Sequence, residues 1–207
     1  MTGRRRSSPS AARPAGDDAA LLCAQDMPSA PPTARHNPGR MSSRGVISER
    51  ILGHNLMKLV ILAVGRGRAA PEQTLVRDWL GRLPQGGAVI EVESKLPAGP
   101  ARTRDEGERL LKKLPATAPL IACDPHGRDT SSEALATLLQ RHRDDGAAAV
   151  YFAIGGADGH DRRVLDRAPS RIAFGSATWP HMLFRAMLAE QLYRASMILA
   201  GHPYHRG

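Results

Sequence analysis

The C-terminal residues 201–207, Gly-His-Pro-Tyr-His-Arg-Gly, concentrate titratable and cationic side chains at the end of the chain. The guanidinium of Arg206 could pair with a phosphate or a carboxylate through two parallel hydrogen bonds. His205 could carry a proton near neutral pH, because the ordinary pKa of histidine is about 6.5. The spacing of His202 and His205 could suggest a metal site, but no cysteine or acidic residue stands near them in the sequence, so we expect none. Taken alone, the tail could equally be a solvated terminus.

A second group of candidate residues lies in a glycine-rich stretch, Ile-Gly-Gly-Ala-Asp-Gly at residues 154–159, at the end of an apolar run. Glycines carry no Cβ and so allow a ligand to approach the backbone closely. Two other apolar runs end in unusual loops, at residues 123–127 and 175–181. Because ligands of open α/β sheets bind beyond the carboxyl ends of the strands, we predict that the three loops wall one pocket.

Another glycine-rich stretch, Gly-Arg-Gly-Arg-Ala-Ala at residues 65–70, fits the spacing of the dinucleotide-binding pattern. The helix would begin only after this loop, at Pro71. The acidic candidates for binding a ribose, Glu91 and Glu93, alternate with Val92 inside a strand and do not mark its end. A glycine turn between a strand and a helix is therefore the preferred interpretation, and a nicotinamide-dependent oxidoreductase remains an alternative function.

These loops need a regular scaffold, and the sequence predicts one from residue 58 onward. Short β-branched or apolar runs alternate there with helical patterns, as in parallel strands joined by helical crossovers. The runs predict strands at residues 58–64, 88–93, 120–123, 149–154 and 171–174. The patterns predict helices at residues 72–82, 102–114, 132–144, 161–168 and 181–200. We therefore predict an α/β fold with a parallel sheet and helices on both faces.

Two of the predicted helices carry local signals. Ser131 or Ser132 can cap the third helix, because a serine hydroxyl accepts a hydrogen bond from an unpaired backbone N–H. The last helix has one apolar stripe at spacings of three and four residues, formed by Phe184, Leu188, Leu192, Ala195 and Leu199. Arg185, Gln191 and Arg194 lie away from this stripe.

Length and composition limit the possible classes of protein. With 207 residues, 42% hydrophobic and 24% charged, the chain allows one compact domain with a tail or at most two small domains. No apolar run approaches the roughly 18 residues that a membrane span needs. Two cysteines make a disulfide framework improbable, so we expect a soluble protein of the reducing cytoplasm. The formal net charge of +9 favours a polyanionic partner such as nucleic acid, with a basic surface kept for solubility as the alternative.

Residues 1–56 differ in composition from the rest, with three consecutive arginines at positions 4–6 and prolines that would interrupt any helix or strand. We expect this segment to be disordered. It lacks the apolar core of a secretory signal, and its acidic residues argue against an organelle transit peptide. A mis-assigned translation start is the favoured explanation, because Met57 stands immediately before the first predicted strand.

Four stretches together resemble one known family. They are Met-Lys-Leu-Val-Ile-Leu-Ala-Val-Gly at residues 57–65, Ile-Gly-Gly at 154–156, Leu-Ala-Glu-Gln-Leu-Tyr-Arg-Ala at 188–195 and His-Pro-Tyr-His-Arg at 202–206. They resemble the ribosomal RNA large subunit methyltransferase H family of the SPOUT class. The resemblance covers residues 57–207 and makes this segment the expected methyltransferase domain. Nothing in residues 1–56 matches.

The resemblance implies a parallel α/β sheet with a trefoil knot near the C-terminus, which periodicity could not have indicated. It further implies a homodimer that binds S-adenosylmethionine, needs no metal, and methylates N3 of a pseudouridine in the large-subunit (23S) ribosomal RNA. The positive net charge would then serve an RNA substrate within the ribosome. A noncatalytic ribosome-binding module is a further alternative, and it would bind RNA without transferring a methyl group.

Carried over residue by residue, the resemblance implies roles for individual positions. The expected cofactor-binding residues are Cys123, Gly156, Gly175, Ser176, Ala177, Thr178, Trp179 and Pro180. Familiar members of the family have leucine in place of Cys123 and Trp179 and serine in place of Gly175, so the side-chain packing should differ. The expected catalytic residues are Tyr204, His205 and Arg206, with Arg206 binding a phosphate or a base carbonyl and His205 acting as the base. In a dimer of this class, the tail of one subunit can reach the cofactor pocket of the other.

Overall fold

The first strand, β1 (Lys58–Val64), is buried on both of its faces, since every residue of it after Lys58 is buried. This burial follows from its place inside a parallel sheet that is covered on both sides, the situation in which strands read as continuous apolar runs. The computed structural model describes residues 57–67 and 70–205. The predicted disorder of residues 1–56 and the predicted role of Arg206 concern residues outside this part.

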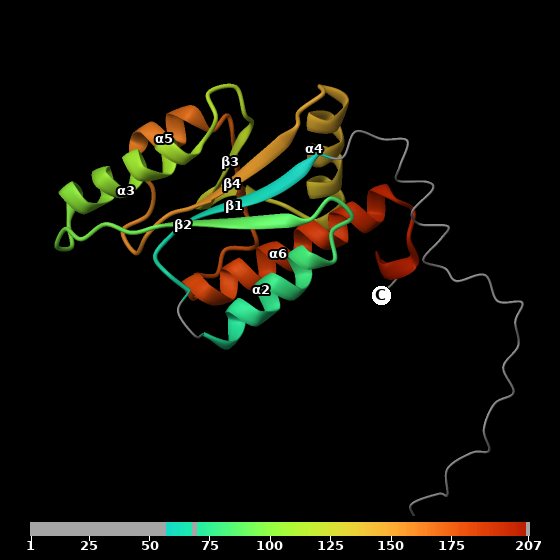
Figure 1. The fold of residues 1–207 in the computed structure, drawn as a ribbon, viewed down its shortest axis with the longest axis horizontal. Coiled ribbons are helices and arrows are strands. Elements are labelled where there is room, and N and C mark those ends of the chain that lie inside the picture. Colours follow the sequence, from blue (N-terminus) through green and yellow to red (C-terminus); the bar gives the residue numbers. More distant parts are fainter. Residues whose placement is uncertain (1–56, 68–69, 206–207) are drawn as a thin grey trace, which may run out of the picture. The chain divides into compact units, whose positions relative to one another are not determined.

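Five parallel strands form one sheet in the order β2-β1-β4-β3-β5 (Figure 1). Besides β1, the strands are β2 (Gly87–Val92), β3 (Leu120–Asp129), β4 (Ala149–Ile154) and β5 (Ser170–Ala173). Four of the five predicted strands agree with these bounds to within one residue at each end. Because all strands run in the same direction, the loops that follow them meet at one edge of the sheet.

Helices cover both faces of the sheet, as the sequence predicts. One core contains apolar residues of α2 (Pro71–Gly81), α4 (Ser132–Asp144) and α6 (His181–Leu199). The other contains residues of α3 (Pro100–Lys113) and α5 (Arg162–Arg167). Figure 1 shows α2 and α6 on the side of the sheet opposite to α3 and α5. A short 3-10 helix, η1 (Pro203–His205), follows α6. None of the helices in the described ranges combines the length and the apolar character needed to cross a membrane.

The strand β3 is longer than the predicted residues 120–123, and it pairs with β5 across an irregularity between Cys123 and Arg128. Proline and glycine in this segment read locally as strand breakers. In the fold, however, Gly127 lies so close to β5 that an added Cβ would stand 2.7 Å from the backbone of Ile172. The glycine thus permits the close approach that extends the strand, and it also shapes the loop after Cys123.

The structure confirms the predicted cap of the third helix but places Arg185 of the last helix differently from the prediction. Ser131 is the residue that caps α4, and its hydroxyl accepts a hydrogen bond from the backbone N–H of Ala134 at 3.2 Å. Arg185, which the sequence places off the apolar stripe of α6, is nevertheless fully buried. Its position is explained by polar partners at the end of β1, described below.

Candidate active site

A cavity of about 940 Å³ lies at the carboxyl-terminal edge of the sheet. The irregular segment of β3 that begins at Cys123 and the loops after β4 and β5 wall it, together with the first turn of α6. The three loops singled out from the sequence therefore do meet. Of the eight expected cofactor-binding residues, six line the cavity: Cys123, Gly156, Gly175, Ala177, Thr178 and Trp179. Ser176 and Pro180 belong to the same loop as the last four but do not line the cavity.

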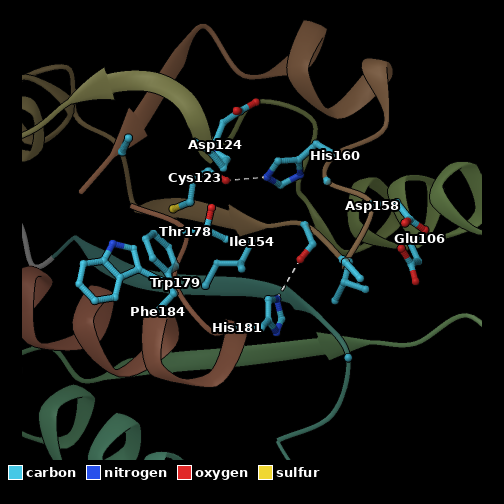
Figure 2. Close-up of a pocket in the computed structure, with 18 of the residues that line it drawn as sticks. Glu106, Cys123, Asp124, Ile154, Asp158, His160, Thr178, Trp179, His181 and Phe184 are labelled. Carbon is cyan, nitrogen blue, oxygen red and sulfur yellow. Dashed lines mark hydrogen bonds between the residues drawn. The ribbon is translucent and has the colours of Figure 1, made fainter. Parts of the chain in front are cut away.

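One end of the cavity is apolar and aromatic. Figure 2 shows Cys123, Ile154, Trp179 and Phe184 gathered there. The indole N–H of Trp179 donates to the carbonyl oxygen of Phe174 at 3.0 Å, and the rings of Phe174 and Phe184 lie 5.5 Å apart between centroids. Burial raises the pKa of the Cys123 thiol, so this group is a neutral thiol at physiological pH. Such a surface suits a flat heteroaromatic ring.

Two histidines fix the loops around this end (Figure 2). His160 Nε2 lies 2.9 Å from the carbonyl oxygen of Cys123, and His181 Nε2 lies 2.8 Å from the carbonyl oxygen of Gly155. Burial lowers the pKa of both imidazoles, and the positive charge of Arg185 lowers that of His181 further. Neutral imidazoles therefore donate their Nε2–H to these two carbonyls. The contacts tie the loop after β4 to β3 at Cys123 and to the start of α6.

The glycines of the loop after β4 are required by close packing. An added Cβ on Gly155 would stand 2.8 Å from the carbonyl oxygen of Gly159, because the loop turns back on itself in a bridge between Gly156 and Gly159. An added Cβ on Gly156 would stand 2.6 Å from Oε2 of Glu106 and 3.2 Å from a methyl group of Val64. The loop therefore presents bare backbone to the cavity.

The other end of the cavity is charged. Glu106 and Arg102 project from α3 and Asp158 from the glycine loop, and all three line the cavity. Arg102 lies 3.0 Å from a carboxylate oxygen of Asp158 and 3.5 Å from one of Glu106. Glu106 is 7% exposed, and burial raises the pKa of its carboxyl. The sequence patterns did not single out any of these three residues as a site residue, apart from the place of Asp158 in the glycine-rich stretch.

An internal ion pair holds the start of the glycine-rich stretch at residues 65–70. The guanidinium of Arg185 donates to Glu91 at 2.6 Å and to the carbonyl oxygens of Val64 and Gly65 at 2.7 and 2.8 Å. Glu91 also accepts a hydrogen bond from the backbone N–H of Gly67 at 2.8 Å. The carboxylate that could have bound a ribose is thus occupied. These contacts support the interpretation of Gly65 to Gly67 as the start of a turn that follows a strand.

The tail lies at the other end of α6. Tyr204 donates its hydroxyl to Glu190 at 3.1 Å, and Arg194 stands 5.0 Å over its ring. The same ring contacts Tyr193 and Trp79. The ring thus lies beside residues 190–194 of α6, about 14 to 20 Å along the helix axis from His181 at 1.5 Å per residue, and Tyr204 does not line the cavity of its own chain. Burial raises the pKa of its phenol, so the hydroxyl is protonated.

In the described ranges, no three histidine, cysteine, aspartate or glutamate side chains form a group that could hold a metal ion. The arrangement instead offers a half-open pocket with one aromatic end, one charged end and backbone amides and carbonyls between them. Those features can hold an elongated organic ligand that has a flat ring at one end and charges at the other.

Comparison with known proteins gives a consistent result. The family model described as "Predicted SPOUT methyltransferase" matches residues 57–205. A protein of Rhodospirillum rubrum named "Ribosomal RNA large subunit methyltransferase H" is 51% identical over 151 residues, which cover 72% of this chain and 99% of that protein. The proteins of the same name from Paramagnetospirillum magneticum and Rhizobium etli are 51% and 42% identical, over 151 and 159 residues, with the same shares covered.

Proposed function

The chain belongs to the SPOUT methyltransferase family, and from this we propose that it transfers the methyl group of S-adenosylmethionine to N3 of a pseudouridine in the large-subunit (23S) ribosomal RNA. The observation that carries the proposal is the cavity at the strand ends, with its aromatic and charged ends and its backbone-lined middle. S-adenosylmethionine has features that match the two ends, since its adenine is flat and aromatic and its methionyl part carries an ammonium and a carboxylate.

The bound sulfonium supplies an electrophilic methyl group, so the protein has two remaining tasks. It must align the acceptor nitrogen with that methyl group, and it must accept the N3 proton as the new N–C bond forms and the S–C bond breaks. His205 is the proposed base, and Arg206 is proposed to bind a phosphate or a base carbonyl of the acceptor. Tyr204 is the third residue proposed for the acceptor side; its single O–H donates to Glu190, so its phenol oxygen can accept a hydrogen bond from the substrate.

A homodimer is part of the proposal, because the tail and the cavity stand at opposite ends of α6 within one chain. A second copy could place its own tail over this cavity and complete the acceptor side. Trp179 and Leu183 support the idea of a contact near the cavity, since both side chains are large, apolar and exposed, just before and within the first turn of α6. The substrate would place the reaction in the cytoplasm, where ribosomes assemble.

The trefoil knot of the class is proposed for residues 120–181. Contacts between the loops support it: Gly175 N donates to Asp129 at 2.9 Å, and His181 donates to Gly155. These contacts join the end of β3 to the loop after β5, and the loop after β4 to the start of α6, in the region where the resemblance implies a knot. Residues 57–207 are proposed as the complete methyltransferase domain.

The test is transfer of a labelled methyl group. The purified protein is incubated with methyl-labelled S-adenosylmethionine and large ribosomal subunits, and the RNA is digested and its nucleosides are separated. The proposal expects label in a methylated pseudouridine. Tight binding of NAD without binding of S-adenosylmethionine would favour an oxidoreductase, and ribosome binding without label would favour a noncatalytic module.

A further inference from the structure

The charged end of the cavity contains polar groups that the protein itself leaves incompletely satisfied. Nε of Arg102 is buried and has no hydrogen-bond partner among the described residues. Glu106 accepts no hydrogen bond from the part of the chain that the structure describes, and its contact with Arg102 at 3.5 Å is longer than a charged hydrogen bond. A buried carboxylate with so few donors has an uncompensated desolvation cost, which a donor on a ligand would offset. Both groups line the cavity, where a ligand could reach them.

The position of Glu106 is fixed relative to the glycine loop. Its Oε2 stands where a Cβ of residue 156 would be only 2.6 Å away, so the carboxylate lies directly against the backbone of Gly156. It also stands apart from the aromatic end, since Figure 2 shows Glu106 and Asp158 on the side opposite to Trp179 and Phe184. A ligand whose ring lies between those aromatic side chains would extend its other end toward Glu106.

The charges of the cluster complement those of the proposed cofactor. The two carboxylates and one guanidinium of this cluster carry a net charge of −1 when both carboxyls are ionised. S-adenosylmethionine carries a sulfonium, an ammonium and a carboxylate, which give it a net charge of +1. An ammonium is a donor of three hydrogen bonds and suits a carboxylate, whereas a guanidinium suits the ligand's carboxylate.

We propose that Glu106 accepts a hydrogen bond from the α-ammonium of S-adenosylmethionine and that Arg102, held by Asp158, binds its α-carboxylate. This assignment rests on the proposed function and adds to it a binding site for the amino-acid end of the cofactor. The pair selects ligands that carry an amino acid over adenosine derivatives that lack one. Glu106 and Arg102 are thus specificity-determining residues of the cofactor site.

The test measures binding of three ligands by calorimetry. S-adenosylhomocysteine carries the whole amino-acid end, 5′-methylthioadenosine lacks it, and decarboxylated S-adenosylmethionine keeps the ammonium alone. Glu106→Gln should weaken S-adenosylhomocysteine at least about tenfold, the scale of one hydrogen bond between charged groups. It should leave 5′-methylthioadenosine within about twofold, which also verifies that the pocket is folded. Arg102→Gln should weaken S-adenosylhomocysteine and leave decarboxylated S-adenosylmethionine nearly unchanged.

Glu108→Gln is the matched control, because Glu108 lies on the same helix, is half exposed, and pairs with Lys112 away from the cavity. It should change no affinity. The melting temperature gives a second readout. Burial raises the pKa of Glu106, so the charged carboxylate is unfavourable in the fold. Glu106→Gln removes this charge, and its melting temperature should be no lower than that of the wild type. A purely structural role for Glu106 would instead lower the melting temperature.

Each remaining outcome decides against the inference. Equal loss of S-adenosylhomocysteine and 5′-methylthioadenosine in Glu106→Gln would place the carboxylate on the ribose and overturn it. Unchanged affinity for both ligands would also overturn it, while the proposed function would survive because the wild type still binds them. Failure of the wild type to bind any of the three ligands would overturn the proposed function and this inference together.

Discussion

Nε2 of His181 lies 2.8 Å from the carbonyl oxygen of Gly155, so the first residue of the last helix holds the glycine loop after β4. His160 makes the corresponding contact with the carbonyl oxygen of Cys123 at 2.9 Å. The two imidazoles thereby connect three segments that are separate in sequence and that together enclose the cavity. Each contact needs one donor on Nε2, which a neutral imidazole provides.

These contacts predict a dependence of stability on pH. Burial lowers the pKa of both histidines below 6.5, so the unfolded chain binds more protons than the fold does in the window below that value. The stabilisation is complete above pH 6.5 and is lost as the pH falls through the lowered pKa values. We expect the melting temperature to fall over this range in the wild type and to fall less in the double variant His160→Asn, His181→Asn. Identical pH profiles for the two proteins would contradict this explanation.

Gly156→Val should weaken binding of S-adenosylmethionine at least about tenfold. The branched side chain would collide with the carboxylate of Glu106 and with Val64, and so would displace the loop that lines the cavity. Gly81→Ala is the control, because an added Cβ there meets no atom within 4 Å. Calorimetry on both folded variants measures the effect. Unchanged affinity in Gly156→Val would show that the cofactor does not bind at this loop, and Gly65 and Gly67 would again be candidates for the cofactor site.

The scaffold could be predicted because parallel strands and their crossover helices leave strong local patterns. The run that forms β1 is apolar throughout since both of its faces are covered, and its bounds agree with the prediction. The extension of β3 could not be predicted in this way. Gly127 reads as a breaker in the sequence, and only the proximity of Ile172, 45 residues later, reveals why a glycine stands there.

The walls of the candidate site were predictable for the same reason, since strand ends are recognisable and must meet at one edge. The charged end was not recognised. Glu106 stands four residues before the buried Leu110 and so lies on the buried face of α3, unlike Glu108, but only the fold shows that this face meets Gly156. The burial of Arg185 likewise could not be predicted from the sequence. Its partners, Glu91 and the carbonyls at the end of β1, lie about a hundred residues away along the chain.

The tail should act on methyl transfer and not on cofactor binding. Arg206→Ala and His205→Ala are each expected to lower the transfer rate about 10- to 100-fold, the scale for loss of an orienting or proton-accepting group, with cofactor affinity nearly unchanged. Full activity in both variants would remove the tail from the mechanism.

Mixing subunits tests whether the tail acts across a dimer. Arg206→Ala and Gly156→Val subunits are each expected to have low activity as homodimers when S-adenosylmethionine is not saturating. A mixed dimer contains one site that combines a normal loop with a normal tail, so it should recover part of the activity. Absence of recovery in heterodimers verified by native mass spectrometry would confine each tail to its own subunit.

Residues 57–207 alone should fold and keep their methyltransferase activity. The five strands begin at Lys58, and the match to the family begins at residue 57. The truncated chain and the full chain are compared by circular dichroism and by initial rate of methyl transfer. A rate more than about tenfold lower in the truncated chain would show that residues 1–56 contribute to the enzyme, since a tenfold change corresponds to about 1.4 kcal/mol of activation free energy.

The central claim is methylation of a pseudouridine in the large-subunit ribosomal RNA, and nucleoside mass spectrometry of that RNA from a strain lacking this gene tests it most directly. One pseudouridine is expected to lose the mass of a methyl group in the deletion strain and to regain it when the wild-type gene is restored. The Gly156→Val gene should restore less of this methylation than the wild type does. An unchanged set of modified nucleosides in the deletion strain would contradict the claim.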